Sequence, residues 1–170
     1  FTFTPTESQG PGVYDLTIWV TDGSNTDTET ISITVNEVNT APISNDVSDS
    51  LDEDTSKWIT LDATDDDEPS NTITYSIDTT PSNGTLGAIS GNEALYTPNA
   101  DFYGTDSFTY IANDGEDNSN IATVYITVNP VNDGPVANPD STSGNEDEDN
   151  VVSKDTLLSN DTDVDDTVLT

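Results

Sequence analysis

The chain has 170 residues, of which 34 are Asp or Glu and only two are Lys, so its net charge is −32, and it contains no Arg, His or Cys. This charge excludes nucleic acids as partners, because proteins bind them by neutralising phosphates with Lys and Arg, and it repels anionic membranes. The lack of His and Cys excludes thiolate chemistry, structural zinc sites and Ser-His-Asp catalysis. No apolar run approaches the roughly 18 residues of a membrane span, so we expect no membrane insertion.

The amino-acid composition favours strands and turns. The chain contains 28 Thr, 17 Ser and 17 Asn, but only 8 Leu and 8 Ala. Thr suits the pleated surface of a strand, Asn and Ser suit turns, and good helix formers are scarce. We therefore expect an all-β fold with no helix longer than a turn.

Alternation of apolar and polar residues predicts the strands. In chain order they lie within 43–56 and at 57–63, 72–78, 85–89, 93–97, 106–113 and 121–128. Ile59 and Leu61 should share a core face, and Phe108, Tyr110 and Ala112 should do so later in the chain. About seven strands in roughly 93 residues is the size of an immunoglobulin-like sandwich.

One segment of the sequence occurs twice. Its landmarks recur after 92 or 93 residues: Asp22 and Asp114, Val35 and Val128, Pro42 and Pro135, Glu53 and Glu146. A constant offset over several landmarks indicates tandem copies. We predict the C-terminal half of one repeat at 1–40, a complete repeat at 41–134, and the N-terminal part of a third at 135–170. Flanking chain, or identical chains in a filament, would complete the two half-units.

The carboxylates are concentrated in loops. Of the 34 acids, 18 fall in four short windows, 46–54, 62–68, 146–149 and 161–166. Two carboxylates about 4 Å apart repel by ~1 kcal/mol in water and ~4 kcal/mol at an effective dielectric near 20, so such clusters call for a cation. Oxygen ligands without His or Cys select calcium or magnesium, and irregular loop geometry suits calcium better. We therefore expect Ca²⁺ as the cofactor.

The spacing of Asp163 and Asp165 matches the start of an EF-hand loop. The Gly and the final Glu that the loop requires are missing, however, so the pattern is not an EF-hand. Asp65 and Asp67 form the same pattern in the middle unit. A catalytic carboxylate pair is needed once per protein, whereas these acids recur with each unit, so we do not expect an enzyme.

Together these motifs resemble the cadherin-like tandem repeats of large bacterial surface proteins. The motifs that carry the resemblance are Asp52–Thr55, Tyr96–Phe108, Val131–Pro135 and Leu158–Asp165. The resemblance covers essentially the whole chain and implies tandem Greek-key β-sandwich domains of the cadherin or immunoglobulin type. It also implies an extracellular or cell-surface location, with calcium between successive domains stiffening each linker.

The resemblance further implies which residues hold the metal. At the first junction, between the first and second units, they are Glu7, Asn36, Asn39, Asp65, Asp67 and Asp114. At the second junction they are Glu53, Asp101, Asn129, Asn132, Asp133, Asp163 and Asp165. The first linker has Thr40 where the second has Asp133, so we expect fewer or weaker ions at the first junction.

Several of these residues also fit simpler roles. Asp22, Asp114 and Asp133 each precede Gly, where Asp commonly caps its own turn. Asp106 precedes a strand, so we expect a local cap rather than a ligand. Lys57 is expected to be an exposed strand lysine, with an isopeptide crosslink to an Asn as the alternative.

The sequence thus predicts a calcium-rigidified structural repeat that forms the stalk or fibre of a secreted or cell-surface protein of the adhesin or biofilm type. Its expected partners are the neighbouring repeats of the same chain. The alternative is a carbohydrate- or partner-binding adhesin domain that recognises surface glycans, because Trp58 and Tyr103 offer aromatic rings on which sugars stack.

Overall fold

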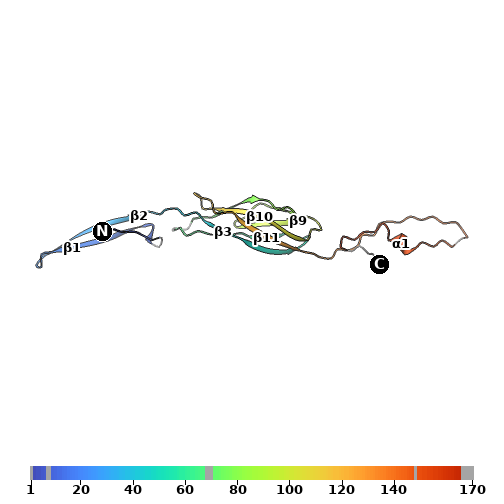
Figure 1. Ribbon diagram of the computed structural model, residues 1–170, viewed down its shortest axis with the longest axis horizontal. Helices are drawn as coiled ribbons and strands as arrows, with labels where there is room; N and C mark the ends of the chain where they lie inside the picture. The colour runs from blue at the N-terminus through green and yellow to red at the C-terminus, as the bar shows by residue number, and fades with distance from the viewer. Residues whose placement is uncertain (1, 7–8, 68–70, 148, 166–170) are drawn as a thin grey trace.

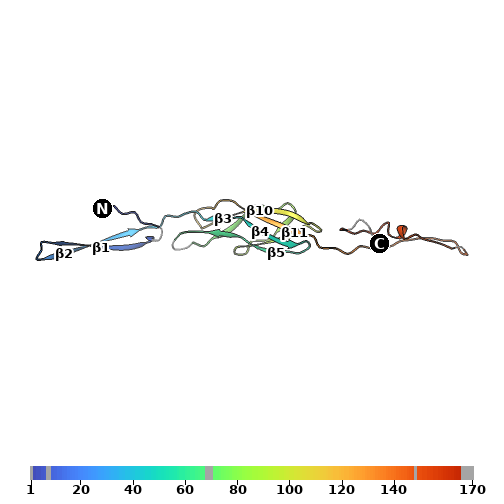
Figure 2. The same cartoon turned by 60° about the horizontal axis from the view of Figure 1, so that its bottom comes forward.

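The computed structural model describes residues 2–6, 9–67, 71–147 and 149–165. It places a β-hairpin, a β-sandwich and a largely irregular C-terminal segment one after another along a single axis (Figure 1). The same order is seen after a turn of 60° about that axis (Figure 2).

Eleven strands and one short helix make up the described secondary structure. In chain order they are β1 (Gly12–Thr21), β2 (Thr26–Val35), β3 (Ile43–Asn45), β4 (Val47–Asp52), β5 (Lys57–Thr60), β6 (Asp62–Thr64), β7 (Thr74–Thr79), β8 (Gly84–Leu86), β9 (Glu93–Pro98), β10 (Gly104–Asn113), β11 (Ala122–Asn129) and α1 (Lys154–Leu157). The fold is all-β, as predicted. No helix among the described residues has the length and hydrophobicity needed to cross a membrane.

Strands β3 to β11 form the sandwich. One sheet has the order β4-β11-β10-β7 and the other β5-β9-β8, while β3 pairs with β6. Strand β4 runs parallel to β11, and the remaining pairs are antiparallel. Non-consecutive strands therefore lie side by side, as in the cadherin and immunoglobulin folds.

The sandwich has nine strands rather than about seven, because two predicted segments divide and change sheets. In the first segment, Asp46 separates β3 from β4 and accepts a hydrogen bond from the backbone N–H of Thr123 (2.7 Å). In the second, Leu61 separates β5 from β6 and donates its N–H to the carbonyl of Asn92 (2.7 Å). At the first break the chain passes from β3, which pairs with β6, to β4 in the four-stranded sheet, and at the second it passes from β5 in the three-stranded sheet to β6, which pairs with β3.

The core lies between the two sheets. Phe108, Tyr110 and Ala112 of β10 are at most 1% exposed, and Ile59 and Leu61 are each 1% exposed. The alternation seen in the sequence therefore predicted the core faces correctly. Phe108, Tyr110, Ile59 and Leu61 form one core cluster with alternate residues of β11, namely Ala122, Val124, Ile126 and Val128.

Asp106 is a charged residue buried in the sandwich, and its carboxylate is hydrogen-bonded. Asp106 accepts from the Tyr96 hydroxyl (2.9 Å) and from the backbone N–H groups of Asn83 (2.9 Å) and Ser82 (3.1 Å). Burial and this carboxylate raise the pKa of Tyr96. Asp106 lies within β10 rather than before a strand, and these donors come from the 82–83 turn and from β9, so the prediction of a local cap was wrong: the carboxylate connects distant parts of the sandwich.

The flanking segments reproduce parts of the sandwich. The β1–β2 hairpin pairs from Gly12 with Val35 to Thr21 with Thr26 and corresponds in sequence to β10–β11. In the C-terminal segment Val136 pairs with Thr162, as Ile43 pairs with Thr64 at the start of the sandwich. This recurrence favours tandem units, while the boundaries at 40/41 and 134/135 stay predictions.

Candidate metal sites at the two junctions

The Asp65–Asp67 loop follows β6 at the end of the sandwich that faces the β1–β2 hairpin. The N–H of Asp67 donates to Oδ1 of Asp65 (3.1 Å), which folds the loop so that both carboxylates lie on the same side. Asp67 is 3% exposed. One oxygen of Asp65, Oδ2, is buried and has no hydrogen-bond partner among the described residues.

Asp114 follows β10 at the same end and has two roles. Its Oδ1 accepts the N–H groups of Glu116 and Asp117 (both 2.7 Å), so it caps its own turn. Its Oδ2 accepts from the Asn39 side-chain amide in the linker (3.1 Å). The hydrogen bonds from these two N–H groups are the main cause that lowers the pKa of Asp114.

The first cluster consists of Asp65, Asp67 and Asp114. Each offers a carboxylate oxygen, and these oxygens lie within 4.8 Å of one another. The linker reaches the cluster, because the N–H of Thr40 donates to Asp67 (3.1 Å to Oδ1 and 3.3 Å to Oδ2). Three residues predicted from widely separated positions thus come together beside the linker.

The other residues predicted for the first junction differ in their placement. Asn39 contacts the cluster through its amide, whereas Asn36 is exposed and lines a shallow cleft with Val35 and Val38. Glu7 lies outside the described residues. The prediction omitted Asp117, whose carboxylate also accepts from Asn39 (3.2 Å).

The second cluster lies at the opposite end of the sandwich and consists of Asp54, Asp101 and Asp133. Their carboxylate oxygens also lie within 4.8 Å of one another. Asp54 and Asp101 adopt φ angles of 58° and 57°, in the left-handed region. The N–H of Asp101 donates to Oδ1 of Asp54 (3.3 Å), so the two turns that carry them are directly connected.

Glu53 joins this end of the sandwich to the second linker. Its N–H donates to the carbonyl of Asn129 (2.9 Å), and its Oε1 accepts the N–H of Val131 (2.7 Å). Glu53 is 2% exposed. Its Oε2 and Oδ2 of Asp133 are buried and have no hydrogen-bond partner among the described residues.

Burial and surrounding negative charge raise the pKa of Asp133. Burial is the largest cause, followed by the charges of Asp54, Asp165, Asp101 and Glu53. Asp133 is therefore surrounded by carboxylates from the sandwich and from the C-terminal segment, and this repulsion is what a bound cation would relieve.

The C-terminal segment supplies the far side of the second junction. The N–H of Asp165 donates to Oδ1 of Asp163 (2.9 Å), and the N–H of Asp133 donates to Oδ2 of Asp165 (2.5 Å). The same two hydrogen bonds hold Asp65, Asp67 and Thr40 at the first junction. The two junctions therefore share one backbone arrangement.

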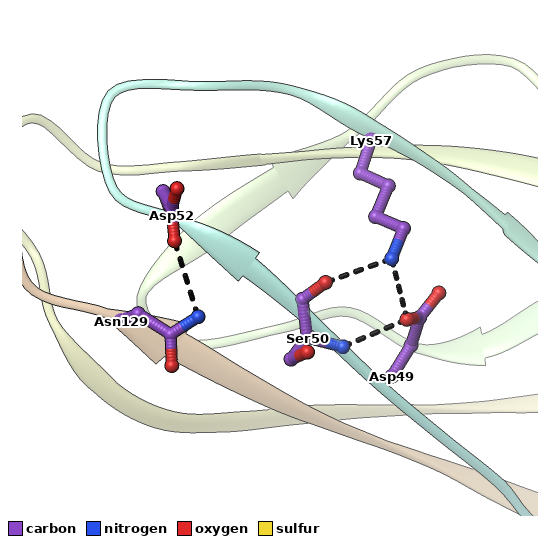
Figure 3. A network of polar contacts seen from close by, with 5 residues as sticks. All are labelled: Asp49, Ser50, Asp52, Lys57 and Asn129. Carbon is purple, nitrogen blue, oxygen red and sulfur yellow. Dashed lines mark hydrogen bonds and ion pairs between the residues drawn. The ribbon is translucent and has the colours of Figure 1, made fainter.

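The two asparagines predicted as ligands at the second junction are placed differently. The Asn129 amide donates to Oδ1 of Asp52 (3.2 Å), as Figure 3 shows, and the Asn132 amide donates to the carbonyl of Asp133 (2.5 Å). The prediction omitted Asp54, although it lies in the same acidic run as Glu53. The sequence identifies the run at 52–54 as acidic, but it does not show which of these adjacent carboxylates points to the cluster.

Lys57 pairs with a carboxylate that belongs to neither cluster. Its ammonium group contacts Oδ1 of Asp49 (2.6 Å) and the carbonyl of Ser50 (2.8 Å), as Figure 3 shows. Its partners are thus a carboxylate and a carbonyl on β4 rather than an Asn side chain. This is the ordinary strand lysine that the sequence predicted, and it connects β5 to β4.

The sequence profile of the bacterial Ig domain matches residues 39–127. The chain belongs to this family. Bacterial Ig domains and cadherin-like domains are typically non-enzymatic. The matched residues contain the whole sandwich apart from the end of β11, and they include the first cluster.

Three solved structures are compared with this chain by their backbone similarity. The extracellular cadherin domains 1–5 of protocadherin gamma B2 match with a TM-score of 0.57 at 20% identity, over 87% of this chain and 31% of that one. The endo-fucoidan hydrolase MfFcnA4 of glycoside hydrolase family 107 matches with a TM-score of 0.42 at 18% identity, over 71% of this chain and 19% of that one. The surface-layer protein SbsC, domains 4–9, matches with a TM-score of 0.36 at 16% identity, over 74% and 19%.

The chain therefore spans less than a third of each of these structures. No curated protein matches it in sequence. The protocadherin match supports the cadherin-like form of the bacterial Ig domain and carries no information on ligands.

Proposed function

We propose that this bacterial Ig domain is a structural repeat of a secreted or cell-surface protein, and that calcium held at its junctions stiffens the connection between neighbouring units. One observation carries the proposal. At both junctions a linker N–H donates to the second Asp of an Asp-x-Asp loop in the following unit, beside three carboxylates within 4.8 Å.

Electrostatics supports a cation at these sites. Carboxylates about 4 Å apart repel by ~1 kcal/mol in water and by ~4 kcal/mol at an effective dielectric near 20. The chain has only two lysines, of which Lys57 pairs with Asp49 and Lys154 begins α1. Among the described residues no ammonium group pairs with either cluster, so an ion from solution is the source of positive charge that we propose.

The donor set supports calcium over other metals. Carboxylate, amide and carbonyl oxygens select hard cations, and His and Cys, which bind zinc and copper, are absent from the sequence. Calcium accepts six to eight oxygen ligands in irregular geometry, whereas magnesium requires a near-ideal octahedron. At the second junction, loops of the sandwich and of the C-terminal segment and the linker supply oxygens in an irregular arrangement of this kind.

The mechanism is linkage between binding and rigidity. At the second junction the carboxylates come from the sandwich, the linker and the C-terminal segment, whereas at the first all three come from the sandwich and the linker is held to them by Asn39 and Thr40. An ion that binds only when these parts are together stabilises that arrangement by RT ln(1 + [Ca²⁺]/Kd), about 2.7 kcal/mol at 100 times Kd. A row of such units would serve as the stalk or fibre of a surface protein.

A thermal melt with calcium and with a chelator tests the proposal. We expect calcium at 100 times its Kd to raise the Tm by roughly 10 °C, and chelation to increase the radius of gyration measured by X-ray scattering. Magnesium at equal concentration and a sodium chloride series of matched ionic strength are the controls. If calcium changes neither quantity, or if sodium chloride reproduces its effect, the proposal is wrong.

A further inference from the structure

Protein N–H groups already compensate much of the charge at the first junction. Asp67 accepts from the backbone of Thr40 (3.1 Å) and from the Asn71 amide (3.3 Å). Asp114 accepts from the Asn39 amide (3.1 Å) as well as from its own turn. These donors hold Asp67 and Asp114 beside the linker, and one buried oxygen of the cluster, Oδ2 of Asp65, has no hydrogen-bond partner among the described residues, against two such oxygens at the second junction.

The second junction has more charge and fewer such donors. Asp133 takes the place of Thr40, 93 residues later in the repeat, and its Oδ2 is buried without a hydrogen-bond partner among the described residues. Glu53 is only 2% exposed, and its Oε2 is likewise buried without a hydrogen-bond partner among the described residues. Its charge also acts on Asp133. A buried, unpaired carboxylate oxygen is costly, so these oxygens favour separation of the junction unless a cation binds them.

The second junction also offers an entry path for an ion. A cleft of about 320 Å³ lies there, lined by Asp101, Asp133 and Asp163 together with neighbouring residues of the linker and the C-terminal segment. Carboxylates from the sandwich, the linker and the following unit therefore border one open space.

We propose that the two junctions respond differently to calcium: the second is a calcium-controlled hinge that loosens when the ion is removed, and the first stays closed. This inference rests on the proposed function, since it assumes that calcium is the ion. The additional carboxylate of Asp133 attracts a divalent ion even through water, so the second junction should bind calcium roughly 10- to 30-fold more tightly than the first.

Spin labels placed across each junction of the whole chain test this difference. The sequence contains no cysteine, so two introduced cysteines would be the only labelled positions. Exposed positions suit the labels: Thr28→Cys with Thr85→Cys spans the first junction, and Thr85→Cys with Val151→Cys spans the second. Double electron–electron resonance would then give the distance distribution across each junction as calcium is added.

We expect the distribution across the first junction to be narrow with and without calcium. Across the second junction it should be broad in chelator and should narrow as calcium is added. A first junction that is broad in chelator and narrows at the same calcium concentration as the second, or a second junction that is narrow in chelator, would overturn the inference. If calcium affects neither distance nor the Tm, the proposed function itself fails, so the two failures are distinguishable.

Reciprocal substitutions provide matched variants, because both keep the linker N–H. Thr40→Asp should broaden the first junction in chelator and make its width depend on calcium. Asp133→Thr should raise the calcium midpoint of the second junction at least tenfold. Asp140→Asn, an exposed acid beyond the linker, removes one charge as a control and should change neither junction. Equal effects of Asp133→Thr and Asp140→Asn would show that only total charge matters.

Discussion

The interior of the sandwich and its two ends are held together in different ways. The interior is apolar, and its buried Asp106 accepts hydrogen bonds from three neighbouring groups, including Tyr96. At the ends, three buried carboxylate oxygens have no partner among the described residues: Glu53 Oε2, Asp65 Oδ2 and Asp133 Oδ2. The buried carboxylate of the interior is thus compensated by protein donors, whereas the ends keep buried oxygens that a cation would compensate under the proposed function.

Truncation of a core residue should have the largest effect, and calcium should not alter it. Phe108 is 1% exposed at the centre of the core, so Phe108→Ala should lower the free energy of unfolding by about 3–5 kcal/mol. Urea denaturation in calcium and in chelator measures this. Tyr103→Ala, at a side chain 59% exposed, is the control and should cost far less. If the loss in free energy of unfolding depends on calcium, the interior and the ends are not held together in different ways.

Loss of the internal hydrogen bond to Asp106 should have a smaller effect, again without calcium dependence. Tyr96→Phe removes the hydroxyl donor at 2.9 Å and should lower the free energy of unfolding by about 1.5–3 kcal/mol, the usual range for hydrogen bonds to charged groups. Tyr125→Phe is the matched control, because Tyr125 is 52% exposed. Equal losses in the two variants would show that Asp106 does not need this donor.

Neutralisation of Glu53 should act in opposite directions with and without calcium. Glu53→Gln keeps an oxygen to accept from Val131 (2.7 Å) and removes the charge beside Asp133. In chelator the variant should be more stable by about 1 kcal/mol, because less repulsion remains. In calcium it should have a smaller Tm increase than the parent chain. Glu93→Gln, at an exposed acid of β9, is the control, and a uniform loss of stability would contradict the prediction.

The two ends should also titrate differently in the absence of calcium. The pKa of Asp114 is lowered by its turn donors, so the stability it contributes is present above 3.8, the value for a free Asp, and is lost as the pH falls through its lowered pKa. The pKa of Asp133 is raised by burial and nearby carboxylates, so it takes up a proton above pH 3.8, and this reduces the repulsion between carboxylates at the second junction. Carbon NMR of the two carboxyl groups in chelator should show Asp133 protonating first. If Asp114 instead takes up its proton at a higher pH than Asp133, the carboxylates at the second junction do not repel one another as described.

The local pattern in the sequence was sufficient to predict the core. Alternation in the segments that became β10 and β11 correctly placed Phe108 and Val124 inside, because one sheet face is buried along their length. It did not predict the change of sheet at Asp46 and Leu61, because that change depends on hydrogen bonds to distant residues such as Thr123. The strand count was therefore too low.

The candidate sites were predictable to the level of loops, but not of individual side chains. The resemblance placed Asp65, Asp67 and Asp114 in one site, and the structure brings them together. It did not include Asp54, because neighbouring acids in a run look alike until the backbone fixes their directions. The exposure of Asn36 likewise depends on how the linker runs.

The left-handed backbone at Asp54 and Asp101 limits what can replace them. A positive φ costs most residues about 1 kcal/mol or more, and Gly, Asn and Asp tolerate it best. Asp147, 93 residues after Asp54, has the same conformation with a φ of 61°. Of the three tolerated residues, only Asp carries a charge. A sister repeat could thus exchange these aspartates for Gly or Asn and keep its turns intact, at the loss of two of the three carboxylates of the second cluster.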